Sequence, residues 1–214
     1  MAQHSSRKQA RSELTRDRLI RSAEKIFARD GLEAAKLEEI AANAGYTRGA
    51  FYANFQSKED LFFALLERQV ASRVAKVQSE MDKLDDPLAK LEALRKLLLD
   101  LCLDRRWSLL ALEFKLFAVR HPEVKARLAA MNRRLVRSRV RILQDVMGDL
   151  RRDLPASANA VGISLSALSN NLTLEHMLDR TLMPEDAVKK IMGSFFDSLT
   201  GAVPNREADG KRRK

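Results

Sequence analysis

The sequence predicts an all-α protein. Apolar residues recur at spacings of i, i+3 and i+4 along most of the chain, and capping residues or prolines separate these stripes. Only 8 Gly and 5 Pro interrupt the 214 residues, a length sufficient to bury a sizeable core. We therefore expect about nine helices in one or two domains.

The composition is that of a soluble protein, with 45% hydrophobic and 32% charged residues. No segment approaches the roughly 18 uninterrupted apolar residues of a membrane span, and the N-terminus lacks the apolar core of a signal peptide. Because Cys102 is the only cysteine, an intrachain disulfide is excluded. These features favour the cytoplasm. The net charge of +10 favours polyanions in general but does not locate a binding site.

The first predicted helix spans residues 14–29, and Gly31 ends it. Residues 1–12 carry basic side chains without periodicity, so we expect a disordered tail, with a basic arm that follows a nucleic-acid backbone as the alternative. The inner stripe of the helix is Leu19, Ala23, Ile26 and Phe27.

A second, short helix is predicted at 36–44, where Leu37, Ile40 and Ala41 share one face. Gly45 follows it. Glycine adopts the left-handed conformation at low cost, so the chain can reverse direction there within a few residues.

A third helix is predicted at 48–55, with the Thr47 hydroxyl as its cap and Phe51 and Phe55 packed on the preceding helix. Two short helices, a glycine turn and a polar outer face are typical of a helix-turn-helix, whose second helix enters the DNA major groove. Two packed helices of an ordinary core are the alternative interpretation. The outer face would present Thr47, Arg48, Gly49, Tyr52 and Asn54.

A fourth helix is predicted from Lys58 to about residue 82, with Ser57 and Asp60 as a capping box at its start. A helix N-terminus and the Lys58 ammonium group beside the third helix would both favour a phosphate.

From Thr15 to Phe62 the chain resembles the DNA-binding domain of the tetracycline-repressor (TetR) family. The resemblance depends on Phe27, Gly31 and the runs IAANAGYTRGAFYANF and SKEDLF. It implies an N-terminal three-helix helix-turn-helix DNA-binding domain at 13–73 with the motif at 36–55, and a C-terminal helical ligand-binding and dimerisation domain at 74–204. The second tail, 205–214, is polar and expected to be disordered.

We expect Thr47 and Tyr52 to contact phosphates and Arg48 to contact a base edge, most simply guanine, while Gly49 permits close approach to DNA. The family usually has threonine where this chain has Lys36, and a smaller aliphatic residue at Tyr46 and often histidine at Asn54, so its operator sequence does not carry over. The predicted DNA-binding set is Lys36, Thr47, Arg48, Gly49, Tyr52, Asn54 and Lys58.

Five further helices are predicted, at 86–104, 107–119, 122–146, 159–179 and 184–201. Asp86 followed by Pro87 is a typical helix start. The last two helices carry apolar stripes that we expect to pair with their copies in a second subunit, as the family resemblance also implies. Burial within one subunit is the alternative. The predicted dimer interface is Leu165, Leu168, Leu172, Val188, Ile191 and Phe195.

A pocket for a small, apolar or amphipathic effector is predicted between the C-terminal helices. The same residues could instead be ordinary core, with His176 hydrogen-bonded in the interior. Eight basic residues between 120 and 141 are interpreted as a solvated helix face, with a site for an anionic ligand such as an acyl-coenzyme A as the alternative. The predicted pocket residues are Trp107, Glu113, Phe114, Phe117, Asn171 and His176.

No metal, cofactor or catalytic constellation is predicted, because the three histidines and Cys102 are scattered and no nucleotide-binding or nucleophile motif occurs. The sequence therefore predicts a transcriptional regulator, most simply a homodimeric repressor that binds a palindromic operator and is released by an effector. An activator, or a repressor without an inducer, fits the same residues. A helical scaffold that uses its basic helix on acidic partners or membranes is the rival, and it predicts binding indifferent to DNA sequence.

Overall fold

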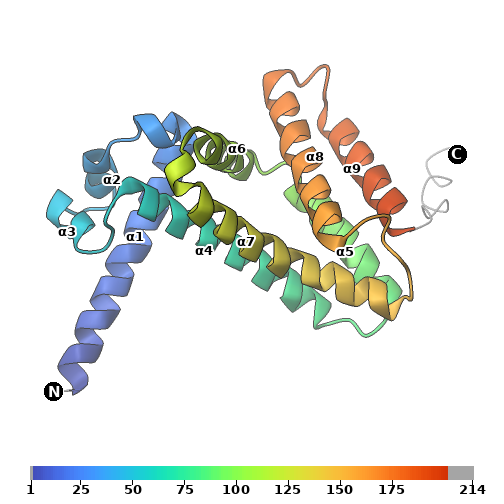
Figure 1. Cartoon of the computed structure of the whole chain (residues 1–214), viewed down its shortest axis with the longest axis horizontal. Helices are drawn as coiled ribbons and strands as arrows, with labels where there is room; N and C mark the ends of the chain where they lie inside the picture. The colour runs from blue at the N-terminus through green and yellow to red at the C-terminus, as the bar shows by residue number, and fades with distance from the viewer. Residues whose placement is uncertain (1, 202–214) are drawn as a thin grey trace, which may run out of the picture. The chain divides into compact units, whose positions relative to one another are not determined.

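The computed structural model describes residues 2–201, with the backbone alone at 2–9, 123, 124, 127, 128, 135, 138 and 139. Over these residues the chain forms nine helices and no strands, which confirms the predicted all-α fold (Figure 1). The tail predicted at 205–214 lies outside the described residues. The helices are α1 (Ala2–Ala34), α2 (Leu37–Asn43), α3 (Arg48–Tyr52), α4 (Lys58–Met81), α5 (Pro87–Leu101), α6 (Arg105–Arg120), α7 (Pro122–Asp149), α8 (Ala158–Leu178) and α9 (Glu185–Thr200).

The described chain divides into two compact units. Unit 1 contains residues 2–72 together with Leu109–Leu128, and unit 2 contains Arg73–Ser108 together with residues 129–201. The break at 72/73 is next to the predicted domain boundary, but the segment 109–128 was predicted to belong wholly to the second domain. This difference arises from contacts between residues far apart in sequence, which helical periodicity does not reveal.

Unit 1 is built around aromatic and aliphatic side chains of α1, α2, α3 and α4. The rings of Phe27 on α1 and Phe62 on α4 pack edge to face, with centroids 5.3 Å apart and planes at 89°. This geometry adds a favourable quadrupole interaction to the burial of both rings. The largest fully buried side chains of the unit include Leu19, Ile26, Phe27, Leu32, Ile40, Phe51, Leu61, Phe62 and Leu65.

Helix α1 begins earlier than predicted. It begins at Ala2, so residues 2–12, which we predicted to be disordered, are helical. These residues contain no Gly or Pro and several good helix formers, so local propensity favours a helix without an apolar stripe. At the other end, Gly31 has the non-helical angles φ 77° and ψ 172°, so the regular helix ends there as predicted, and a short helical segment up to Ala34 follows the kink.

Glu113 on α6 contacts this kink within unit 1. Its carboxylate accepts a hydrogen bond from the Leu32 backbone N–H at 3.2 Å. A Cβ atom at Gly31 would lie 3.0 Å from Glu113 Oε1, and its φ would be strained for any other residue. The kink and the carboxylate therefore require glycine at this position.

Unit 2 has its core between α5, the later part of α7, α8 and α9. Helices α8 and α9 run side by side as an antiparallel pair (Figure 1), and α9 also contacts α5. Arg95 on α5 binds the buried Asp197 carboxylate on α9 through two hydrogen bonds, of 2.7 and 3.1 Å. The core residues are Leu91, Cys102, Leu143, Val146, Met147, Val161, Leu165, Leu172, Val188, Met192 and Phe196.

Candidate functional site

The turn between α2 and α3 has the geometry that its glycine predicts. Gly45 adopts φ 78°, and its N–H donates to the Ala42 carbonyl at 2.9 Å. The Tyr46 N–H donates to the Ala41 carbonyl, also at 2.9 Å. This pair of hydrogen bonds is the Schellman motif, which satisfies the last carbonyls of α2 and redirects the chain.

Helix α3 begins at the predicted cap, where the Thr47 hydroxyl accepts a hydrogen bond from the Ala50 N–H at 3.3 Å. The helix is shorter than predicted, ending at Tyr52, although the Phe55 N–H still donates to the Phe51 carbonyl. Phe51 is fully buried and its ring centroid lies 5.9 Å from that of Phe55, so these two rings attach α3 to the core.

The outer face of α3 is exposed and polar. Thr47, Arg48, Gly49 and Tyr52 are all exposed, and Tyr52 retains 47% of its accessible surface. A Cβ atom at Gly49 would meet only Thr47 Oγ1, at an ordinary 3.7 Å. Packing within the chain therefore does not require glycine at position 49, whereas close approach of an external molecule would.

Arg48 has two partners on this face. Its guanidinium donates to the Tyr52 hydroxyl at 3.4 Å and forms an ion pair with Glu38 of α2 at 2.9 Å. The hydrogen bond to Tyr52, together with the Glu38 carboxylate, raises the pKa of Arg48 above its ordinary value. Because both members of the ion pair are largely exposed, the pair is weak and can exchange for another acceptor. Helical periodicity did not predict the ion pair between Arg48 and Glu38.

Asn54 and Lys58 are occupied by contacts within the protein. The Asn54 side chain donates to the Ala50 carbonyl at 2.8 Å and accepts from the Ser12 hydroxyl at 3.2 Å. The Lys58 ammonium donates to the Glu33 carbonyl at 2.5 Å. Both residues are half-buried, and the DNA contact expected of each stays a prediction. Lys36, the residue before α2, is exposed.

Arg16 is a further residue of this region that the sequence analysis missed. Its guanidinium lies over the Phe55 ring, 4.2 Å from the centroid, and donates to the Asn54 carbonyl at 3.0 Å. Arg16 follows Ser12 by one helical turn, so both α1 side chains reach the end of α3. That spacing was the available signal, and we overlooked it because we expected no helix before residue 14.

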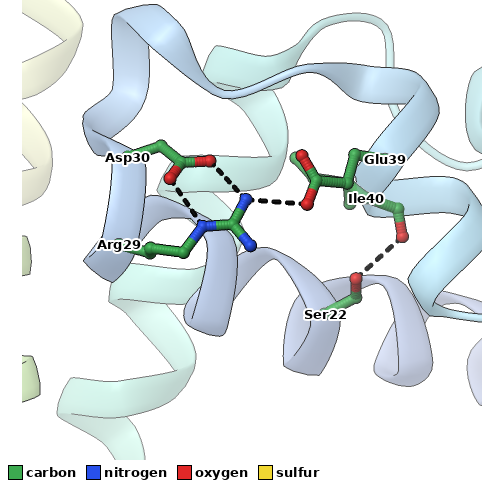
Figure 2. A network of polar contacts seen from close by, with 5 residues as sticks. All are labelled: Ser22, Arg29, Asp30, Glu39 and Ile40. Atoms are coloured by element: carbon green, nitrogen blue, oxygen red, sulfur yellow. Dashed lines mark hydrogen bonds and ion pairs between the residues drawn. The ribbon is translucent and has the colours of Figure 1, made fainter.

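A second polar network holds α2 against α1 (Figure 2). Arg29 donates to both Asp30 carboxylate oxygens at 2.6 Å and to Glu39 on α2 at 2.7 Å, and the Ser22 hydroxyl donates to the buried Ile40 carbonyl at 2.8 Å. The hydrogen bond with Asp30 is the main reason that the pKa of Arg29 is raised, and Arg29 lowers the pKa of Asp30. These contacts fix the direction in which α2 presents its N-terminus.

The predicted effector-pocket residues are divided between the units. Trp107 lines an apolar cavity of about 190 Å³ in unit 2, together with Asn170. Glu113, Phe114 and Phe117 belong to unit 1, and neither Asn171 nor His176 lines the cavity. Of the six predicted residues, this cavity therefore includes Trp107 alone, and a pocket role for the other five stays a prediction. The helical pattern identified apolar faces, but it did not show which faces leave a space between them.

Two of these residues have contacts elsewhere. The His176 Nδ1 atom lies 2.9 Å from the Met183 carbonyl, and the residue is half-buried, so it shows the hydrogen bond of the alternative interpretation without full burial. Phe117 is buried in unit 1 with its ring centroid 4.2 Å from that of His121. Arg73, which lines the cavity, was not predicted because it lies on the polar side of α4 by sequence pattern.

Some of the predicted dimer-interface residues are buried within one subunit, and others are partly or largely exposed. Leu165, Leu172 and Val188 are buried within unit 2, as the alternative interpretation stated. Leu168 and Phe195 pack partly against the same core, and Ile191 is 40% exposed. Other large apolar side chains exposed on α8 and the loop after it are Ile163, Leu178 and Leu182.

Within the described residues, no helix combines the length and apolarity needed to cross a membrane. In the same part of the chain, no group of three or more His, Cys, Asp or Glu side chains is arranged to hold a metal ion.

The comparisons with known proteins agree with this geometry. The family model described as "Bacterial regulatory proteins, tetR family" matches residues 19–65. The chain is 39% identical over 98 residues to the probable HTH-type transcriptional regulator ArpR of Pseudomonas putida, covering 43% of this chain and 45% of that protein. It is 39% identical over 62 residues to the HTH-type transcriptional repressor BepR of Brucella suis, covering 29% and 30%. The matches span less than half the length of these curated relatives.

The fold of the whole chain also matches solved structures. The transcriptional regulator FadR of Bacillus subtilis, in complex with stearoyl-CoA, superposes with a TM-score of 0.66 over 87% of this chain and 98% of that one. Only 14% of the residues are identical, so this similarity concerns the fold alone.

Proposed function

Because residues 19–65 make this chain a member of the TetR family of bacterial regulatory proteins, we propose that it represses transcription by binding a palindromic operator as a homodimer and leaves the operator when a small-molecule effector binds. The observation that carries the proposal is the exposed face of α3, where Thr47, Arg48, Gly49 and Tyr52 surround a position that internal packing leaves open. Among the similar proteins, BepR of Brucella suis is named as a repressor, which supports repression, and FasR of Mycolicibacterium smegmatis is named as an activator.

On DNA, helix α3 enters the major groove. Arg48 exchanges its ion pair with Glu38 for a guanine edge, which presents two acceptors to a guanidinium. Thr47 and Tyr52 contact phosphates, and Lys36 contacts the backbone beside them. Asn54 and Lys58 also connect α3 and the start of α4 to α1, through Ser12 and Glu33.

Dimerisation uses the outer faces of α8 and α9. Helix α8 is apolar around most of its circumference, so one side fills the core while Ile163 and Leu178 remain exposed. Ile191 and the half-buried Phe195 extend this surface onto α9. A two-fold axis through such a surface gives two α3 helices and hence a palindromic site, with half-sites about one DNA turn apart or slightly further.

Effector release requires a ligand that binds unit 2 differently in the DNA-bound and released conformations. The cavity lined by Trp107 is the site that we assign to it. A coupling free energy of about 1–3 kcal/mol is typical of such switches and corresponds to a 5- to 150-fold change in operator affinity.

Selection of bound sequences from a random duplex pool, at physiological salt, tests the DNA-binding part of the proposal. One enriched palindrome, which an Arg48→Ala variant binds more weakly and less selectively, is the expected result. Binding without enrichment that disappears steeply as salt increases would instead indicate charge-driven contact, as a basic scaffold protein would make.

A further inference from the structure

Unit 1 has an open groove between α1 and the end of α2, with a volume of about 440 Å³. Its wall on α1 follows one stripe of the helix, because the exposed members are three or four residues apart. None of the residues that line this α1–α2 groove belongs to the set predicted to contact DNA. The exposed and half-buried lining residues are Leu14, Arg18, Arg21 and Lys25 of α1, with Asn43 and Ala44 at the end of α2.

Three cations face this groove. Arg18, Arg21 and Lys25 are all exposed, and the described lining contains no Asp or Glu side chain. At 1.5 Å per residue, Arg18 and Lys25 lie roughly 10 Å apart along α1, with Arg21 between them. Like charges at this spacing on one helix face repel one another. An anion in the groove would therefore pair with the cations and also remove their mutual repulsion.

The three cations are available to a ligand. Among the described residues, the side chains of Arg18 and Lys25 form no ion pair or hydrogen bond. Arg21 is paired with Asp17, but its side chain is 65% exposed, so the pair is weak. Asp17 also accepts a hydrogen bond from Arg68 of α4 at 2.5 Å. Asp17 therefore keeps a partner when Arg21 binds a ligand instead.

The end of α2 adds hydrogen-bond donors to the groove and little opposing charge. The exposed Asn43 side-chain amide carries two N–H donors. A helix C-terminus is normally unfavourable for an anion, because its last carbonyls are unpaired. Here the Gly45 and Tyr46 N–H groups each donate at 2.9 Å to a carbonyl of α2, which reduces this effect.

Leu14 distinguishes the groove from a purely electrostatic surface. This apolar side chain is 50% exposed and lies one turn before Arg18 on the same stripe. From Leu14 to Lys25 the wall is roughly 16 Å long, which an extended nucleoside triphosphate can span. A nucleobase would cover Leu14 and remove its apolar surface from water, whereas a phosphodiester backbone would not.

We propose that the α1–α2 groove binds a nucleoside triphosphate, with the phosphates on Arg18, Arg21 and Lys25 and the base over Leu14. The planar guanidinium groups donate paired hydrogen bonds to phosphate oxygens, and the lysine ammonium group acts as a point charge. This site is separate from the unit 2 cavity and does not depend on the proposed function.

A bound nucleotide has a consequence for operator binding, and this consequence rests on the proposed function. Ala44 immediately precedes the Gly45 turn that leads into α3, so several negative charges would lie beside the helix that enters DNA. Because these charges repel DNA phosphates, ATP should weaken operator binding by about fivefold or more. Operator DNA should weaken ATP binding by the same factor.

Three probes test the site on the full-length protein, by isothermal titration calorimetry without DNA or divalent cations. They are ATP, inorganic triphosphate and AMP. We expect triphosphate to bind at least about tenfold more tightly than AMP, as additional charged hydrogen bonds predict. ATP should bind about fivefold more tightly than triphosphate, as burial of the exposed half of Leu14 predicts. Equal binding of ATP and either other probe overturns the proposal, as does the absence of ATP binding.

Matched variants locate the bound nucleotide. Arg18→Gln/Lys25→Gln removes two charges from the groove and should weaken ATP binding at least about tenfold. Lys115→Gln/Arg133→Gln removes the same charges from exposed positions outside the lining and should change it less than about twofold. Leu14→Ala should remove the advantage of ATP over triphosphate. Equal losses in the two double variants, with thermal midpoints close to wild type, would mean that net charge alone attracts ATP and would overturn the site.

Operator measurements separate this site from the DNA-binding surface. If the groove contacts DNA instead, wild type will not bind ATP, and Arg18→Gln/Lys25→Gln will lower the salt dependence of operator affinity by about two phosphate contacts. That outcome overturns the proposal. If ATP binds as expected but leaves operator affinity unchanged, the site stands and its consequence for DNA is wrong. If no operator is selected, the proposed function fails, while the calorimetry still tests the site.

Discussion

Arg48 and Glu38 form an exposed ion pair on the face that we assign to DNA, and the two residues should have opposite effects on binding. Arg48→Ala should weaken operator binding and reduce discrimination at one base pair by about 1–3 kcal/mol. Glu38→Gln should strengthen binding modestly, because it removes both a competing acceptor and a charge that repels phosphate. Fluorescence anisotropy with a labelled operator and with single-base variants measures both effects.

A decrease of similar size in both variants would contradict this assignment. It would mean that the pair positions α3 and that Arg48 does not contact the base. Thermal unfolding of both variants is the control, since loss of an exposed pair should change stability by less than about 1 kcal/mol.

Gly45 and Gly49 lie four residues apart but should respond differently to alanine. Gly45 has φ 78°, so Gly45→Ala should destabilise unit 1 by about 1–2 kcal/mol. Gly49 has an ordinary backbone and open space around its Cα, so Gly49→Ala should leave stability unchanged or increase it slightly. Urea denaturation followed by circular dichroism measures this difference.

For operator affinity we expect the opposite ranking, with the larger loss in Gly49→Ala. The added methyl group in Gly49→Ala faces the groove and should reduce operator affinity about tenfold or more, as a steric clash that costs at least about 1.4 kcal/mol would. Gly45→Ala should bind nearly as wild type wherever it is folded. Wild-type affinity in Gly49→Ala would show that α3 does not approach DNA at this position.

At the scale of whole elements, helix packing in unit 2 depends on a glycine of α9. A Cβ atom at Gly193 would lie 2.7 Å from Arg95 Nη2, which binds the buried Asp197 carboxylate. Gly193→Ala should therefore displace the guanidinium and destabilise the protein by about 1–3 kcal/mol. Gly148→Ala on α7 is the matched control, because no atom lies within 4 Å of its added Cβ, and it should be neutral or stabilising by up to about 1 kcal/mol.

The helices themselves were largely predictable, because the signals that begin and end them are local. The Asp86 side chain caps α5 as predicted, and Gly201 ends α9 in the left-handed conformation. The start of α1 was missed because an exposed helical extension needs no apolar stripe. The site was less predictable. Thr47 and Gly45 could be assigned from spacing, but Asn54 and Lys58 bind Ser12 and Glu33 of α1, which are distant in sequence.

The lining of the cavity was also only partly predictable from the sequence. Trp107 could be assigned to a pocket from its position in an apolar helix, but Arg73 could not. The Arg73 guanidinium donates to the Asp104 carboxylate, a contact that forms only when α4 packs beside the start of α6. Spacing along one helix identifies faces, while a cavity is defined by several helices at once.

At the scale of the whole molecule, repression from a palindrome requires two copies of the chain. Ile191 is exposed on α9, whereas Leu172 on α8 is buried in the same unit. Ile191→Glu should give a folded monomer with native helical content and a large loss of operator affinity, because each half-site is then bound alone. Leu172→Ala should remain dimeric but lose about 2–5 kcal/mol of stability through the cavity it creates. Sedimentation equilibrium and thermal unfolding distinguish the two variants. If Ile191→Glu remained a dimer with wild-type operator affinity, the dimer interface would not include this position of α9.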